Sequence, residues 1–487
     1  MKTRTLVVAT LIAIACSAGV AQAVTLNPKG LGQVLIFPYY TVNKGQDTLL
    51  SVINTSTVGS AFKLRFNEGM NGRDVLEFNV LLSPHDVWTA RISQLANDGG
   101  AAVFTSDHSC TYPPIPPGGQ PFRASAYAGG SAFPADGGPT TVARTREGSI
   151  EIIELGAIIP GSDLDDTTTH VQHGNPNTGV PACDAALIGN GANAYVDVPL
   201  GGLFGSASIV NVGEGTFFSY SADAIAGFTD VHLFSGSSGF VPTLQQANTA
   251  DSASAVGAVA HVASNNGNML ALDYANGIDA VSAVFMADEI YNEYLVAAGL
   301  GANTDWVVTF PTKAFYTDPF YNPITANPPF HELFHAPGVS NIEVGASTFD
   351  QEEGYVFSSG GEVDPPIPPP PLPLPYVVNV ISFVNGVALP GNLISGVFGS
   401  TLTSSLAPYG DAGWVVLDLA SGDSASHSLR PAANGYVLHG LPVTGFMVYN
   451  IINANAAPGK LANYGGTYVH RASLSCIRSV TDMNVCP

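Results

Sequence analysis

The chain has 487 residues, of which 46% are hydrophobic and only 11% are charged, and its formal net charge is −22. Charged residues make up about a quarter of an average soluble protein, so uncharged polar residues and glycine have to cover much of this surface. The acidic excess repels nucleic acid and anionic membrane surfaces, and neither is expected as a partner.

The N-terminus has the order of a secretory signal. Lys2 and Arg4 precede an apolar run over 6–15, and small residues end at Ala23. This pattern predicts a signal peptide over residues 1–23 that is cleaved before Val24. The run is too short to span a bilayer, and no later stretch has 18 uninterrupted apolar residues, so we expect no membrane span. The mature chain is expected to be extracytoplasmic: periplasmic, at the cell surface or secreted.

Cleavage leaves four cysteines, and their number is even. In an oxidising compartment this indicates two disulfides, with three connectivities open. The simplest pairing keeps each bond within its own region of the chain and joins Cys110 to Cys183 and Cys476 to Cys486. No C-x-x-C spacing occurs, so neither a zinc site of this type nor covalent haem attachment is supported.

Short runs rich in β-forming residues follow the signal peptide, and Gly, Asn, Pro and Asp separate them. These runs predict strands at 33–40, 48–54, 61–66, 75–82 and 86–92. Half-buried strands at this spacing indicate sheets packed face to face, as in a β-sandwich of Ig-like or jelly-roll type. Residues 106–141 are rich in Gly and Pro, which do not sustain a strand ladder, and predict a long loop.

Strand patterns resume at 149–159, 203–212 and 216–222, the last two separated by a Gly-Glu-Gly turn. Residues 280–298 have apolar positions at helical spacing and are followed by Gly299, a helix stop signal. We expect one helix here, packed on the edge of a sandwich. Residues 304–310 then predict a buried strand that ends at a proline.

Residues 364–375 (DPPIPPPPLPLP) form a polyproline segment, which is stiff and extended. It predicts a division into a large β-rich region, 24–363, and a smaller one, 376–487. The alternative is that the segment is a long loop within one fold. Further strands are predicted after it, at 377–384, 414–419, 436–438, 446–450 and 467–471. The expected class is mainly β, with sandwich units, at least one packed α-helix and long Gly/Pro-rich loops.

Several stretches carry a resemblance: SVINTSTVGSAFKLRFNEG, LSPHDVWTA, TDWVVTFPTK, GLPVTGF and LANYGGTYVHR. With these the chain resembles a group of uncharacterised secreted or surface proteins of proteobacteria. The resemblance covers most of the mature chain, on both sides of the polyproline segment, which favours a single unit. It implies a secreted or surface location. No activity or functional residue is assigned to that group, so none carries over.

Residues 331–335 (HELFH) match the H-E-x-x-H motif of zinc peptidases. On a helix, His331 and His335 share one face as ligands, and Glu332 reaches the metal-bound water as general base. Here prolines stand at 328, 329 and 337, so any helix would be very short. Asn341 stands where the extended motif has its third histidine. We therefore expect a loop with two histidines, and keep a zinc hydrolase as the alternative.

A second cluster comprises Asp163, Asp165, Asp166, His170 and His173. Carboxylates and imidazoles at this density could bind calcium or a transition metal. The spacing fails the EF-hand pattern, because no glycine stands at the sixth position. We expect an exposed acidic loop, and predict no cofactor, with zinc or calcium as alternatives.

The sequence contains no complete catalytic constellation, so we predict a non-catalytic secreted or cell-surface protein with a structural or interaction role. Its partner would be a protein or polysaccharide at the cell surface. The zinc hydrolase is one alternative, and a carbohydrate-binding surface module is another. Trp88, Trp306 and Trp414 could stack on sugar rings, but each lies in an apolar strand and is expected in the core.

Overall fold

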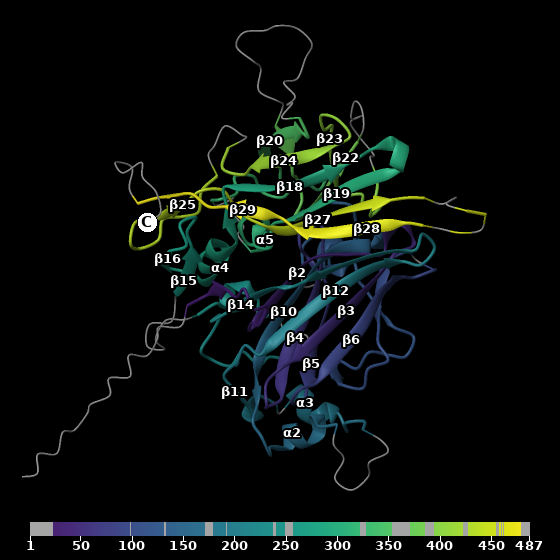
Figure 1. Ribbon diagram of the computed structural model, residues 1–487. Helices are drawn as coiled ribbons and strands as arrows, with labels where there is room; N and C mark the ends of the chain where they lie inside the picture. Colours follow the sequence, from purple (N-terminus) through teal and green to yellow (C-terminus); the bar gives the residue numbers. More distant parts are fainter. Residues whose placement is uncertain are drawn as a thin grey trace, which may run out of the picture.

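The computed structural model describes residues 23–478, except 98, 131–132, 171–178, 191, 237–239, 249–256, 322–327, 353–370, 385–393, 422–426, 454–456, 459 and 461 (Figure 1). Nearly all of the predicted signal peptide, His173, Cys486 and most of the polyproline segment lie outside the described residues. The protein is mainly β, as predicted.

Two sheets in the lower half of Figure 1 form the first sandwich. The larger has eight strands, and in spatial order they are β1 (Thr25–Leu26), β14 (Asp223–Ala226), β2 (Val34–Thr41), β10 (Glu147–Ile158), β4 (Ser60–Glu68), β5 (Asp74–Leu82) and β8 (Cys110–Tyr112), with β11 (Val196–Asp197) beside β10. The facing sheet has six strands: β13 (Thr216–Ser221), β12 (Leu203–Asn211), β3 (Asp47–Asn54), β6 (Val87–Gln94), β7 (Ala101–Phe104) and β9 (Gln120–Pro121).

Alternating side chains of these two sheets make one apolar core. Phe62, Leu64 and Phe66 of β4 point into it from one side, and Trp88 and Ile92 of β6 from the other. Side chains on a strand alternate between its two faces, so every second residue of these strands points into this core. The β-rich runs and turn residues over 33–92 therefore predicted the strands of the first sandwich correctly.

Two five-stranded sheets form a second sandwich in the upper half of Figure 1. In spatial order, the outer sheet contains β21 (Leu372–Pro373), β20 (Glu343–Asp350), β24 (Ala412–Asp418), β18 (Glu289–Leu295) and β29 (Arg471–Ser473). The second, which we call the middle sheet, contains β23 (Thr403–Leu406), β22 (Val378–Phe383), β19 (Ala302–Thr309), β27 (Thr444–Ile451) and β28 (Tyr464–Val469).

The central strands of the middle sheet, β22, β19 and β27, are largely buried on both faces. In β19, Trp306 and Val308 join the core of the upper sandwich, whereas Val307 between them joins the core of the lower one. The same division holds in β27, where Met447 faces the upper core and Phe446 the lower core. A strand covered on both faces reads as a continuous apolar run, which is how 304–310 reads in the sequence. The two sandwiches therefore share this sheet as a common layer.

Strand pairing crosses the polyproline segment. β19 lies before it and pairs with β22 and β27, which lie after it, and β20 pairs with β24 in the same way. A backbone ladder ties the two parts of the upper sandwich together, so residues 24–363 and 376–487 do not form separate sheets. The predicted division is wrong, and the alternative of a long loop within one fold fits this pairing.

The predicted helix at 280–298 is correct only over residues 280–285. Helix α4 covers Gly277–Phe285, with Asn276 as N-cap accepting from the Asp279 backbone N–H at 3.0 Å. The chain then becomes extended in β17 (Met286–Ala287) and β18. Ile290 and Tyr294 of β18 are buried while the neighbouring Glu289 and Glu293 are exposed, so this part follows period 2. The spacing of the apolar residues is compatible with a helix and with a strand, and pairing with β24 makes this segment a strand.

The remaining elements are short. Paired strands are β15 (Ala258–Ala263) with β16 (Met269–Tyr274), β17 with β26 (Leu441–Pro442), and β25 (Val437–Leu438) with β30 (Cys476–Ile477). The other α-helices are α1 (Ser125–Ala128), α2 (Asp163–Thr168), α3 (Ala185–Asn190) and α5 (Lys313–Thr317). Turns of 3-10 helix lie at Asn43–Gly45, Val142–Arg146, Ala192–Tyr195, Leu244–Gln246 and Ala298–Leu300.

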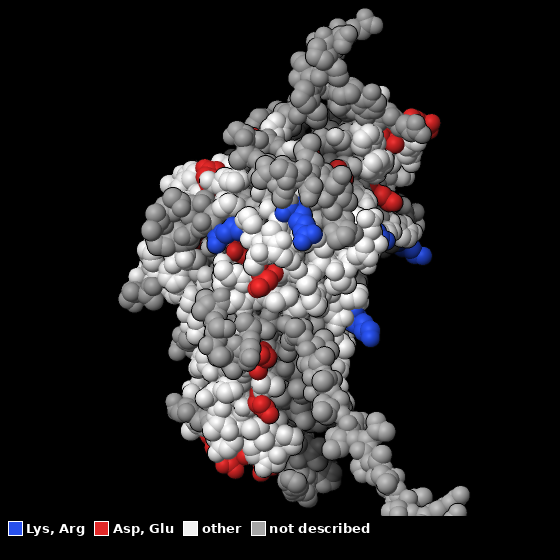
Figure 2. Space-filling view, turned by 90° about the vertical axis from the view of Figure 1, so that its left-hand side faces the viewer, with Lys and Arg blue, Asp and Glu red and all other residues white. Residues whose placement is uncertain are grey.

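Several of the few basic side chains are inside the protein. Arg65 on the outer face of the eight-stranded sheet pairs with Glu151 at 2.8 Å and Glu77 at 3.2 Å, and it also donates to two backbone carbonyls of the loop that covers this face. Buried charges need such partners because the interior solvates them poorly. Correspondingly, Lys and Arg occupy few places on the face drawn in Figure 2, where most described residues are uncharged.

Within the described residues, no helix is both long and apolar enough to cross a membrane.

Candidate functional site

The HELFH motif lies in a loop, not on a helix. Residues 331–335 have no helical assignment, and a turn follows in which the His335 and Val339 backbones exchange hydrogen bonds at 2.9 and 3.0 Å. Phe330 and Phe334 are buried and anchor the loop to the protein. The prolines on both sides leave too little room for a helical turn. His331 and His335 are therefore not presented on one helix face.

Glu332 is engaged in holding this loop closed. One carboxylate oxygen lies 2.5 Å from Nε2 of His335, and the other accepts from the backbone N–H of Asn341 at 2.6 Å. The hydrogen bond that His335 donates to the Glu332 carboxylate is the main reason why the pKa of His335 is raised. His331 stacks on His427 instead, with 5.7 Å between ring centroids. In this arrangement Glu332 is a partner of His335 rather than a base beside a metal-bound water.

The acidic cluster is split up by the fold. Asp163, Asp165 and Asp166 lie in the first turn of α2, where carboxylates favour the positive helix end. His170 lies away from them, with its Nε2 3.1 Å from the Asp86 carboxylate. Across the part of the chain that the structure describes, no group of three or more His, Cys, Asp or Glu side chains is placed to hold a metal.

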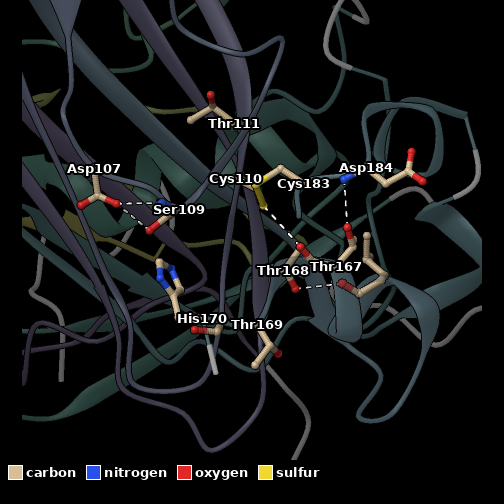
Figure 3. The surroundings of a disulfide bond; sticks show 12 residues. Asp107, Ser109, Cys110, Thr111, Thr167, Thr168, Thr169, His170, Cys183 and Asp184 are labelled. Atoms are coloured by element: carbon tan, nitrogen blue, oxygen red, sulfur yellow. Dashed lines mark hydrogen bonds between the residues drawn. A yellow bond between two sulfur atoms is a disulfide. The ribbon is translucent and has the colours of Figure 1, made fainter. Parts of the chain in front are cut away.

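A disulfide joins Cys110 to Cys183, as in the simplest predicted pairing (Figure 3). Thr167, near the end of α2, holds the Cys183 end of the disulfide in place. The Thr167 carbonyl accepts from the Cys183 N–H at 3.0 Å, and the Thr167 hydroxyl accepts from the Asp184 N–H at 2.8 Å. The bond thus ties β8, at the edge of the eight-stranded sheet, to the lobe containing α2 and α3. Cys476 is disulfide-bonded as well. Because Cys486 lies outside the described residues, the pairing of these two stays a prediction.

The three tryptophans do not share one environment. Trp88 and Trp306 are fully buried, as expected. Trp414 is 42% exposed, and its expected place in the core is wrong. It alternates along β24 with the buried Val415 and Leu417, so it points to the opposite, outward face of the outer sheet.

Trp414 is the centre of a row of three residues on neighbouring strands. Phe349 of β20 and Glu293 of β18 are its direct partners in the two ladders. The rings of Phe349 and Trp414 are stacked, with centroids 4.5 Å apart and 16° between their planes. Directly opposed residues on one sheet face lie close enough for such contacts.

A second aromatic pair belongs to the middle sheet and lies beside the edge of β18. Tyr449 of β27 and Tyr468 of β28 are nearly parallel, with centroids 6.1 Å apart and 12° between their planes. β29 pairs with β18 only over Glu289–Tyr291, and no other described strand pairs with β18 on this side. The space between the two sheets is open here. Asn292 bridges the opening by donating to the backbone carbonyls of Tyr468 and Val469.

Together these residues line an open cavity of about 970 Å³, which we call the aromatic groove. Its main lining side chains are Glu293, Phe349, Asp350, Trp414, Tyr449 and Tyr468. Tyr468 is 48% exposed, so both aromatic pairs present ring area to solvent. A hydrogen bond with Tyr468, together with burial and the negative charge of Glu293, raises the pKa of Tyr449.

The groove offers ring faces and hydrogen-bonding groups in one concave surface. Aromatic faces bind flat apolar surfaces, and carboxylates and phenol groups next to them bind hydroxyls and fix orientation. Of the lining residues, only Trp414 stands out in the sequence as a candidate for binding. Residues 414–417 are a continuous apolar run, so the sequence carries no signal for the exposure of Trp414, and the approach of Tyr449 and Tyr468 depends on sheet packing.

The comparisons with known proteins do not identify relatives: no protein-family model, curated protein or solved structure matches the chain.

Proposed function

We propose that this protein is a non-catalytic, extracytoplasmic binding protein that takes a carbohydrate in the aromatic groove. The observation that carries the proposal is the pair of stacked aromatic platforms, Phe349 with Trp414 and Tyr449 with Tyr468, on either side of Glu293. A pyranose ring has apolar C–H faces and polar hydroxyl edges, and this lining complements both.

The location outside the cytoplasm is supported by three features. The N-terminus has the pattern of a signal peptide. The Cys110–Cys183 disulfide is typical of proteins in an oxidising compartment. Val24, the first residue after the predicted cleavage site, is part of the fold, because its N–H donates to Val259 and its carbonyl accepts from His261, both at 2.8 Å. The resemblance to secreted or surface proteins agrees with this location.

The groove is open, so it can bind part of a long polymer at the cell surface. A cavity of about 970 Å³ with exposed ring faces can hold several residues of a chain that continues beyond it. A polysaccharide is such a chain. The zinc hydrolase alternative gains no support from the loop at 331–335, where Glu332 is bonded to His335 and Asn341; stoichiometric zinc in the purified protein would nevertheless restore it.

The test is a direct binding measurement on the mature protein with a panel of oligosaccharides, by calorimetry or on a glycan array. We expect at least one hexasaccharide to bind, and Trp414→Ala to weaken it about tenfold, since loss of a stacked ring costs about 1.4 kcal/mol. The matched control is Phe217→Ala, because Phe217 is 60% exposed on β13, outside the groove, and its loss should change nothing.

Two outcomes overturn the proposal. One is that no oligosaccharide binds, or that Trp414→Ala and Phe217→Ala have the same small effect. The other is that a proline-rich peptide binds in their place, since aromatic grooves also take polyproline helices.

A further inference from the structure

We infer that the carbohydrate taken by the aromatic groove is cationic: a polymer of amino sugars with free, protonated amines. This inference rests on the proposed function and adds to it the charge of the ligand. We base the inference on the charged residues of the groove, which are acidic.

The charged lining residues are both acidic. Glu293 and Asp350 line the groove, and no Lys, Arg or His is among its lining residues in the described part of the chain. Glu293 is exposed, and among the described residues it makes no ion pair. A carboxylate that bound only neutral hydroxyls would leave this charge uncompensated, whereas a bound ammonium group neutralises it.

The aromatic ring faces of the groove also favour a cationic ligand. The face of an aromatic ring carries a negative quadrupole and attracts a cation, most strongly in the case of tryptophan. Glu293 is the ladder partner of Trp414, and its charge also reaches Tyr449, so an ammonium group beside Glu293 lies near both platforms. Two independent effects, the carboxylates and the ring faces, therefore favour a positive ligand at the same place.

The charge of the whole chain acts at longer range. With a net charge of −22, the protein attracts polycations and repels polyanions before contact. Uronic-acid polymers and phosphate-bearing glycans would meet repulsion both at a distance and in the groove. Neutral sugars remain able to stack on the rings, but they do not use the carboxylates as counter-charges.

The test compares three hexamers of similar size by calorimetry at pH 6 in low salt. These are glucosamine hexamer (cationic), N-acetylglucosamine hexamer (neutral) and a hexamer of uronic acid (anionic). We expect the cationic hexamer to bind at least tenfold more tightly than the neutral one and the anionic one not to bind. Raising NaCl from about 0.05 to about 0.5 M should weaken only the cationic hexamer, because salt screens exposed charges.

The decisive variant is Glu293→Gln, which removes the charge and keeps the side-chain size. It should weaken binding of the glucosamine hexamer at least fivefold and change binding of the N-acetylglucosamine hexamer less than twofold. Glu343→Gln is the matched control, because Glu343 is exposed on the same sheet but outside the groove.

The outcomes separate this inference from the proposed function. If the neutral hexamer binds as tightly as the cationic one and Glu293→Gln affects both equally, the inference is wrong while carbohydrate binding stands. If a hexalysine peptide binds as tightly as the glucosamine hexamer, the groove recognises charge without the sugar, and the amino-sugar assignment is overturned. If no sugar binds, the proposed function itself has failed.

Discussion

Arg144→Ala should destabilise the protein strongly. The guanidinium holds Glu68, with Nε–Oε2 and Nη2–Oε1 distances of 2.6 and 2.9 Å, and Asp136, with Nη1–Oδ1 and Nη2–Oδ2 distances of 3.0 and 2.5 Å. All three side chains are at most 2% exposed. The variant leaves two buried carboxylates without their counter-charge, which costs about 3–5 kcal/mol.

The assay is urea unfolding followed by tryptophan fluorescence, because the buried Trp88 and Trp306 report on the lower and upper sandwich respectively. Arg91→Ala is the matched control: Arg91 lies 3.5 Å from Asp47, but the two side chains are 49% and 34% exposed. An exposed pair contributes about 1 kcal/mol or less. If Arg144→Ala lowers the free energy of unfolding no more than Arg91→Ala does, the reasoning about buried carboxylates is wrong.

Two further predictions concern stability. Burial raises the pKa of Glu154 from 4.5 to about 7. The folded protein therefore holds a proton that the unfolded chain releases, so its free energy of unfolding falls by about 3 kcal/mol as the pH rises through this window. Glu154→Gln should remove this contribution and so flatten the pH dependence in urea titrations between pH 4 and 8; an unchanged slope would contradict it. Cys110→Ser with Cys183→Ser opens a loop with a sequence separation of 73 and should cost about 4 kcal/mol, measured in the same titrations; a loss below 1 kcal/mol would refute the chain-entropy estimate.

The sequence predicted what depends on local pattern. Runs of β-forming residues separated by turn residues located most strands of the lower sandwich, for example β2 and β5, whose side chains are largely buried. It also predicted the β12–β13 hairpin around Gly213 and Gly215.

What it did not predict depends on contacts between distant segments. Residues 286–298 have apolar spacing that fits a helix or a strand, and their pairing with β24, over 100 residues later, decides between them. The groove has the same origin: Trp414 and Tyr468 lie on different sheets, and no spacing in the sequence brings them together. The HELFH motif shows the converse: the match is local, but the prolines on both sides prevent the helix that the zinc-peptidase geometry needs.

The middle sheet has a consequence for the order in which the chain folds. The lower core includes Phe446 and Val448, so the first sandwich lacks part of its apolar cover until the last tenth of the chain is available. Long-range pairing of this kind slows folding and keeps partly folded chains exposed to aggregation. An N-terminal fragment that ends before β27 should therefore be a poorly soluble intermediate, and the protein should reach its native state only after synthesis is almost complete.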